Sequence, residues 1–216
     1  RVRRGAGFGI CPSLVPRAPF LIPRPRGALA RRLSSRFAFS HGPAPRMTGK
    51  LIDRLVAATV FVYSFVLYLA TMAETTPFWD SGEFIAISNG LEVSHPPGAP
   101  FYMLVGRLFS MLSPILGASS PEPIAFSVNL VSVLCSALTI LVTHLVIVRL
   151  VRIWTGHPDT WTPAQRIGAN AGGAIGALTF AATDSFWFNA VEAEVYAMSM
   201  LFTALVVWLA LVWRDA

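Results

Sequence analysis

Long apolar segments dominate this sequence and restrict the folds that are open to it. Four of them, at 55–73, 124–148, 167–183 and 195–213, have the length of a membrane-crossing helix, which needs about 17–25 residues. Hydrophobic residues make up 54% of the chain and charged residues only 13%, which excludes an ordinary soluble domain. Since backbone in lipid must satisfy its own hydrogen bonds, the sequence predicts an all-α, polytopic transmembrane helix bundle.

The first 46 residues have a different composition. They carry ten of the 17 basic residues, seven of the 16 prolines and no acidic residue, and they lack apolar periodicity, so we expect a disordered leader at 1–46. It could be a transit-like peptide, an arm that binds nucleic acid or anionic lipid, or upstream sequence translated in error. We favour the last interpretation, because Met47 leads directly into a charged and then apolar segment. The membrane domain is then 47–216, for which we expect a lipid bilayer and no nucleic acid as partner.

Charge asymmetry suggests a topology for the spans. A fifth apolar piece at 100–116 is ambiguous, because it is short, is flanked by prolines and has Arg107 at its centre. If it lies on the surface instead of spanning, every other basic residue outside the leader falls on one side. We adopt this topology, with a cytoplasmic N-terminus, a first outer loop at 74–123 that holds interfacial helices, and a short second outer loop at 184–194. The acidic residues assigned to the outer side are Glu74, Asp80, Glu83, Glu92, Glu122, Asp184, Glu192 and Glu194.

Small and polar residues inside the spans predict helix contacts. Three glycines spaced by four lie on one face of the segment 167–183, and this face is suited to close packing against a neighbouring helix. They are Gly168, Gly172 and Gly176. Asn129 and His144 lie inside the span at 124–148, and we expect both to bond neighbouring helices rather than a substrate.

Two acids follow the first span in the pattern Asp80-Ser81-Gly82-Glu83. Asp-x-x-Glu before an apolar stretch is typical of a capping box, in which Asp80 accepts a backbone N–H and Glu83 bonds back to the helix start. Capping does not exclude catalysis, because a carboxylate at a helix start is well oriented.

The segment His95-Pro96-Pro97-Gly98 predicts a rigid turn, because proline fixes φ and glycine permits a reversal. The turn would bring a helix at 100–113 back along the membrane surface. His95 could satisfy a local carbonyl or contact an anion. Arg107 could extend to the interface or pair with an anionic headgroup.

A second acidic pattern, Glu192-Ala193-Glu194, lies in the second outer loop. In an extended segment the two carboxylates point the same way and could hold a divalent cation or a cationic partner. In a helix they diverge, and only one would face the first loop. Two acidic clusters on one membrane face favour a shared site.

Three motifs together resemble a known group of membrane proteins. They are Trp79-Asp80-Ser81-Gly82-Glu83-Phe84, Ser94-His95-Pro96-Pro97-Gly98-Ala99-Pro100 and Val191-Glu192-Ala193-Glu194-Val195-Tyr196. The chain from Met47 onward resembles a bacterial multi-span membrane family that is similar to an animal endoplasmic-reticulum O-mannosyltransferase. Both are similar to the GT-C superfamily, the polytopic glycosyltransferases that use lipid-phosphate sugars.

This resemblance implies the N-terminal part of a GT-C-like fold, because GT-C enzymes have more spans than four. It implies transfer of a sugar from a polyprenyl-phosphate donor to a protein or glycan acceptor on the extracytoplasmic face. Carried over by position, Asp80 is the catalytic base and Glu83 orients it or the acceptor. The resemblance also places Glu192 and Glu194 in a second motif that binds substrate or metal. It assigns His95 and Arg107 to the phosphate of the donor.

Two alternatives stay open at this stage. The chain could be a transporter or flippase subunit whose outer acids form a gate, or a structural membrane subunit whose acids are caps and solvated loop residues. A divalent cation could serve the site, and no other cofactor is expected. By the resemblance, we expect a multi-pass protein of a bacterial inner membrane.

Overall fold

The computed structural model describes residues 46–214, and this part of the chain is all-helical, as predicted. The leader prediction for 1–46 therefore lies outside the described residues, except for the last of them. The helices are α2 (Arg46–Thr71), α3 (Ser81–Gly90), α4 (Pro100–Met111), α5 (Ser113–Leu116), α6 (Pro123–Thr155), the 3-10 turn η1 (Pro158–Thr160), α7 (Pro163–Ala181), α8 (Asp184–Val191) and α9 (Val195–Arg214).

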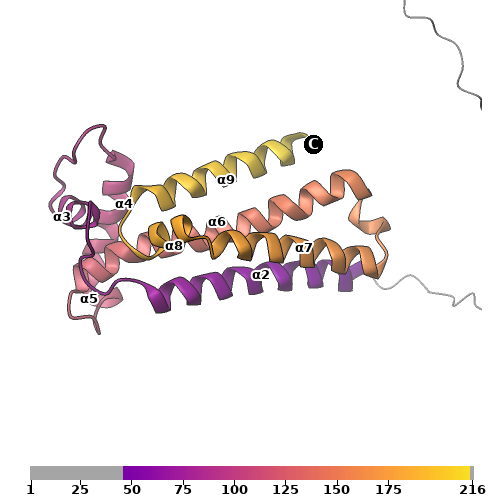
Figure 1. Cartoon of the computed structure of the whole chain (residues 1–216), viewed down its shortest axis with the longest axis horizontal. Helices are drawn as coiled ribbons and strands as arrows, with labels where there is room; N and C mark the ends of the chain where they lie inside the picture. The colour runs from indigo at the N-terminus through magenta and orange to yellow at the C-terminus, as the bar shows by residue number, and fades with distance from the viewer. Residues whose placement is uncertain (1–45, 215–216) are drawn as a thin grey trace, which may run out of the picture. The chain divides into compact units, whose positions relative to one another are not determined.

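Helix α6 is the central element of a bundle that also contains α2, α7 and α9 (Figure 1). Within residues 46–214, three helices, α2, α6 and α9, are long and apolar enough to cross a membrane. Half of the most apolar stretch of α6 is buried, against 17% of that of α2 and 11% of that of α9. The outer faces of α2 and α9 therefore present apolar side chains to their surroundings, as expected of a polytopic membrane protein.

The short helices gather at one end of this bundle (Figure 1). Helix α2 ends and α6 begins at this end, so the segment between them, with α3, α4 and α5, never crosses to the other end. The prediction that 100–116 does not span is thus consistent with the fold, because α4 has only 12 residues. Helix α7 runs beside α2 and α6 but is not among the three helices apolar enough to span, so a fourth span stays a prediction.

The glycine row in α7 makes the predicted helix contact only at Gly176, where an added Cβ would lie 2.9 Å from the Ile147 side chain of α6. A Cβ added at Gly168 or Gly172 would meet nothing within 4 Å, so these two positions do not face a neighbouring helix. The buried row is the adjacent one, formed by Ala169, Gly173, Ala177 and Ala181. A Cβ on Gly173 would lie 2.7 Å from the Val148 side chain of α6. Alternation of Gly and Ala over several turns gave two candidate rows, and the larger side chains of α6 select between them.

Polar contacts close the bundle at the end away from the short helices. The Arg166 guanidinium of α7 donates to the Asp53 carboxylate of α2, and Asn170 donates to the same carboxylate at 2.8 Å. The start of α7 is fixed by a capping box, in which Thr162 and Gln165 exchange hydrogen bonds. These bonds hold α7 against α2 at a point where little apolar surface is available.

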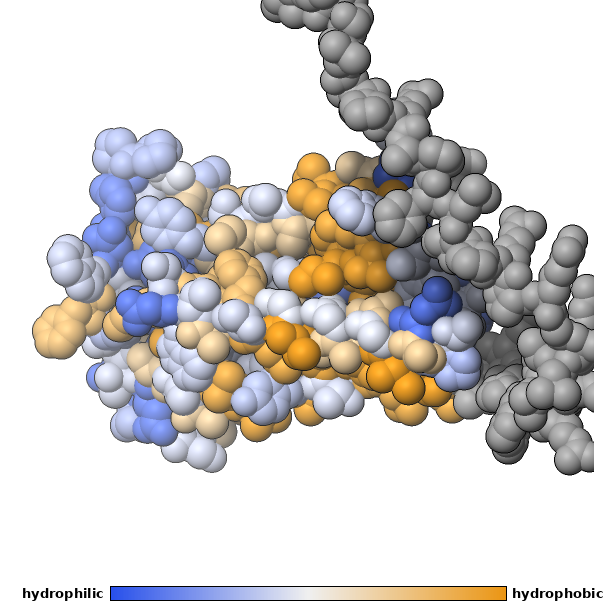
Figure 2. Space-filling view, turned by 45° about the vertical axis from the view of Figure 1, so that its right-hand side comes forward, coloured by the Kyte–Doolittle hydropathy of each residue, from blue (hydrophilic) through white to orange (hydrophobic). Residues whose placement is uncertain are grey.

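An apolar core supports the short helices. It contains Phe84 and Ile87 of α3, Tyr102 of α4 and Val128 of α6, all less than 5% exposed. Helix α3 is therefore packed onto the first turns of α6 and α4 rather than extended into solvent. Figure 2 shows hydrophilic surface at the end of the bundle with the short helices and hydrophobic surface toward the other end.

Candidate functional site

Asp80 occupies the N-cap position of α3, but its side chain makes no capping hydrogen bond. The predicted Asp80–Glu83 capping box is therefore wrong. Asp80 has helical backbone angles, φ −75° and ψ −11°, whereas a capping residue is normally in the β region. The turn into the helix is made instead by Trp79, which has φ +68° and a side chain 92% exposed. This left-handed conformation costs about 1–2 kcal/mol in a residue with a Cβ. It leaves the Asp80 carboxylate exposed and without a capping role.

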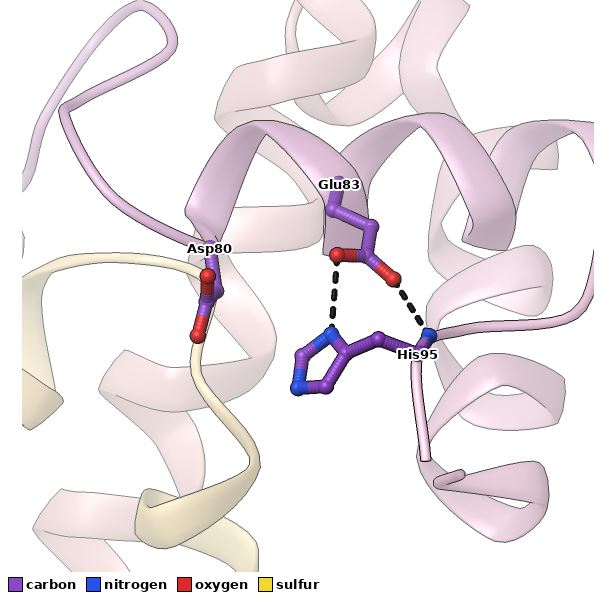
Figure 3. Close-up of side chains that lie close together, drawn as sticks. All are labelled: Asp80, Glu83 and His95. Carbon is purple, nitrogen blue, oxygen red and sulfur yellow. Dashed lines mark hydrogen bonds and ion pairs between the residues drawn. The ribbon is translucent and has the colours of Figure 1, made fainter. Parts of the chain in front are cut away.

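Glu83 points away from the helix start and binds His95 twice (Figure 3). The backbone N–H of His95 donates to Glu83 Oε1 at 2.7 Å, and His95 Nδ1 lies 2.9 Å from Oε2. Asp80, Glu83 and His95 each offer one ligand atom, and these atoms all lie within 4.8 Å of one another. Figure 3 shows the three side chains around a common space at the start of α3.

The turn that carries His95 has the predicted form. Gly98 has φ +81° and donates its N–H to the His95 carbonyl at 2.9 Å, which closes the reversal. Pro100 then begins α4 at a position where its missing N–H costs nothing. Arg107 of α4 is not part of the cluster, because its guanidinium donates to the Asn89 carbonyl near the C-terminal end of α3. The assignment of Arg107 to a donor phosphate stays a prediction.

The second acidic motif comes to the same end of the bundle. Most of the expected second outer loop is in fact helix α8, and only residues 192–194 link it to α9. Glu192 has extended backbone angles, φ −140° and ψ 163°. A backbone hydrogen bond from Ala73 N–H to the Val191 carbonyl, 2.9 Å long, joins the end of the first span to this linker. The two acidic motifs, about 110 residues apart in sequence, therefore follow two segments whose backbones are hydrogen-bonded to each other.

The charges of this end of the bundle act on one another. Burial and, to a smaller extent, the Glu192 and Asp80 carboxylates raise the pKa of Glu194 to about 7, against the opposing effects of a hydrogen bond from the Val195 backbone and of His95. Burial also raises the pKa of Glu192. Hydrogen bonds from His95 lower the pKa of Glu83, and the Glu83 carboxylate raises the pKa of His95. Glu194 is only 9% exposed, and its carboxyl lies close enough to Asp80 and His95 for their charges to act on it.

Three further polar residues support this arrangement, and the sequence analysis missed them. The Ser132 hydroxyl of α6 lies between the backbone N–H and carbonyl of Glu194, at 3.3 and 3.4 Å. The buried hydroxyls of Ser81 and Tyr102 have no hydrogen-bond partner among the residues that the structure describes. Ser132 and Tyr102 lie within apolar runs, where a polar residue is the only sequence signal of such a role.

An apolar groove begins beside Glu194. It lies between the first turn of α4 and α9, has a volume of about 570 Å³, and is lined by residues such as Tyr102, Val195, Met198 and Phe202. Val195 directly follows Glu194, so the charged cluster and the groove share one boundary. A ligand with a charged head and an apolar chain matches this combination.

Comparison with known proteins places these motifs in a family. Residues 80–216 match the family model described as the Protein O-mannosyl-transferase TMEM260 N-terminal domain. The match begins at Asp80 and includes His95, Glu192 and Glu194. No solved structure matches the chain.

Two relatives are similar over most of the chain. Protein O-mannosyl-transferase TMEM260 of Mus musculus is 27% identical over 175 residues, which are 81% of this chain and 21% of that protein. Protein O-mannosyl-transferase tmem260 of Dictyostelium discoideum is 23% identical over 150 residues, which are 69% of this chain and 16% of that protein. The chain therefore spans about a fifth of the length of these relatives.

Proposed function

Because the chain belongs to the family of the TMEM260 protein O-mannosyl-transferase N-terminal domain, we propose that it forms the acidic site of a membrane glycosyltransferase. The donor in this proposal is a sugar linked to a polyprenyl phosphate, and the acceptor is a protein or glycan hydroxyl. Asp80 carries the proposal, since its carboxylate is exposed, has no capping hydrogen bond and is joined by a second acidic motif.

In the proposed reaction, the acceptor oxygen attacks the anomeric carbon of the sugar. The new C–O bond forms as the bond from the anomeric carbon to the phosphate oxygen breaks, and the electron pair leaves with the phosphate. Asp80 takes the proton of the acceptor hydroxyl as general base. Glu83 is the orienting residue, because its two hydrogen bonds with His95 fix the first turn of α3 on which Asp80 depends.

A lipid-linked donor suits the surroundings of the cluster. The groove of about 570 Å³ beside Glu194 is apolar and lies along α9, a helix that is apolar enough to span a membrane. His95, whose pKa is raised by Glu83, is the cation nearest to a departing phosphate in this proposal. In this proposal Glu192 and Glu194 contact substrate or metal from the linker between α8 and α9.

The proposal places the site on the extracytoplasmic face, with a cytoplasmic N-terminus. Basic residues near the start of α2, the end of α6 and the start of α7 gather at the end of the bundle away from the proposed site, namely Lys50, Arg54, Arg149, Arg152 and Arg166. Basic residues next to spans favour the cytoplasmic side.

Sugar transfer in membranes of the source organism tests the proposal, with the gene altered to encode Asp80→Asn. The assay supplies a polyprenyl-phosphate sugar and follows transfer to endogenous acceptors. We expect transfer to fall by at least about 100-fold, since general-base catalysis contributes about 10²–10⁴-fold. Asp184→Asn is the matched control, because Asp184 also lies in the first turn of a short helix but is outside the cluster. Equal transfer by both variants would exclude Asp80 as the base.

A further inference from the structure

We infer that Asp80, Glu83 and His95 form a binding site for one divalent transition-metal cation of the Mn²⁺ or Zn²⁺ class. The three ligand atoms lie within 4.8 Å of one another before any ion is bound. Ligands at about 2.0–2.2 Å from a shared ion lie about 3–4 Å from one another, so small side-chain rotations suffice. The residues come from the N-cap of α3, its first turn and the turn before α4.

The balance of charge at the site points to a cation. Three carboxylates, those of Asp80, Glu83 and Glu194, act on the imidazole of His95, and a fourth, that of Glu192, acts on Glu194. The charged groups that act on Glu194 are two acids and this one imidazole. Arg107, the basic residue of α4, is bound to the Asn89 carbonyl instead.

Glu194 supplies an observation independent of the three ligands. It is 9% exposed, and from the linker before α9 its carboxyl is within range of the charges of Asp80 and His95. A carboxylate is rarely buried so deeply unless it is paired or faces a metal ion. An ion between Asp80 and His95 would give it that partner without direct coordination.

The Glu83–His95 contact is compatible with metal binding. Glu83 Oε1 accepts the His95 backbone N–H at 2.7 Å, a bond that can remain when an ion binds. The second contact, between Oε2 and Nδ1, would open to admit the ion. The retained backbone bond then orients the ligating carboxylate, as partners outside the coordination shell commonly do.

The ligand set indicates the class of ion. An imidazole nitrogen combined with carboxylate oxygens suits Mn²⁺ and Zn²⁺, whereas Mg²⁺ and Ca²⁺ favour oxygen ligands alone. The His95 and Glu83 side chains are 47% and 34% exposed, so the ion would keep open positions for water or a phosphate oxygen. The role of the ion rests on the proposed function: with the ion on His95, the ion in place of the protonated imidazole would neutralise the charge of the departing phosphate, and the second carboxylate oxygen of Asp80 would stay free to accept the proton.

Mn²⁺ binding to the purified full chain in detergent micelles tests the inference. The chain is first treated with a chelator, Mn²⁺ is then titrated, and the paramagnetic resonance signal of free Mn²⁺ measures the bound fraction. We expect one ion per chain with a micromolar dissociation constant. Asp80→Asn and His95→Ala should each weaken binding by at least about tenfold.

The matched control is His157→Ala. His157 also lies near an acid, with Nδ1 3.6 Å from the Asp159 carboxylate, but at the other end of the bundle. Asp80→Asn removes no capping bond, so circular dichroism should show an unchanged helix content. Absence of binding up to about 1 mM Mn²⁺, or equal affinity of the Asp80, His95 and His157 variants, overturns the site.

The binding and transfer experiments can refute the metal site and the catalytic base independently of each other. Mn²⁺ binding together with undiminished transfer by Asp80→Asn would keep the metal site and refute the proposed base. Loss of transfer without Mn²⁺ binding would keep the base and refute the metal site.

Discussion

A methyl group at position 106 would push α3 and α4 apart. A Cβ on Gly106 would lie 2.8 Å from Ser88 Cβ and closer still to the Ser88 hydroxyl. The hydroxyl can rotate away, but the Ser88 Cβ is fixed by the backbone of α3. Ordinary van der Waals contact begins at 3.4 Å, so Gly106→Ala requires the helices to separate by about 0.6 Å.

The size of the effect follows from two opposing contributions. Overpacking of a buried contact costs about 1–3 kcal/mol, whereas Ala in place of Gly stabilises a helix by up to about 1 kcal/mol. We therefore expect Gly106→Ala to lower the free energy of unfolding by about 1–2 kcal/mol. Because α3 carries Asp80 and Glu83 while α4 follows His95, the separation should also reduce sugar transfer, by about tenfold.

Thermal unfolding in micelles, followed by far-UV circular dichroism, measures the first effect. The double variant Ser88→Gly with Gly106→Ala removes the hydroxymethyl group of α3 that would clash with the new methyl group on α4, and it should restore both stability and transfer. The Ser88 hydroxyl has no hydrogen-bond partner among the described residues, so its removal costs no bond. Gly168→Ala is the control, because nothing lies within 4 Å of its added Cβ. The reasoning is refuted if Gly106→Ala unfolds like Gly168→Ala, or if the double variant is no more stable than Gly106→Ala.

Three further outcomes can be measured by unfolding experiments. The pKa of Glu194 is about 7 in the folded chain against 4.5 when unfolded, so the free energy of unfolding falls as pH rises through this window. Glu194→Gln should therefore be about 2 kcal/mol more stable than the parent at pH about 8 in metal-free buffer, with little difference at pH about 4. An equal dependence of stability on pH in the two proteins would contradict this. Asn129→Ala should cost about 1–3 kcal/mol, because Asn129 donates to the Ala73 carbonyl at 2.8 Å from a fully buried position, and an unchanged denaturant midpoint would show that the bond is dispensable. Asp53→Ala should also cost about 1–3 kcal/mol by leaving the Arg166 guanidinium, 13% exposed, without its carboxylate, whereas Arg166→Ala in the same background should add little further loss.

The long helices of the bundle could be predicted because the length and apolarity of a segment determine whether it forms a membrane-spanning helix. The runs at 55–73, 124–148 and 195–213 correspond to α2, α6 and α9. The reversal at His95–Gly98 was predictable for a similar reason, since proline and glycine restrict the backbone locally. Asn129 also bonds a neighbouring segment, as expected of a polar residue in a span.

The errors arise where two local choices have similar energy and distant contacts decide. Glu83 could bond the helix start or His95, and the turn that brings His95 back to α3 is 12 residues away in sequence. Either small-residue row of α7 could have packed. Val148 and His144 of α6 lie against the buried row at Gly173, whereas the predicted row meets α6 only at Gly176. The residues 184–191 lie between two apolar runs, a position that predicts a loop, but Phe186 and Ala190 are buried against the bundle and stabilise a helix.

Main-chain atoms alone make the bond between Ala73 and Val191 that brings the two acidic motifs together. Any residue except proline can stand at position 73 and still donate it. The spacing of the acids is therefore largely indifferent to the side chains near this bond. Relatives that differ at most residues of the spanning helices can keep the same spacing of the two acidic motifs. Sequence change in the spans therefore need not change the chemistry of the site.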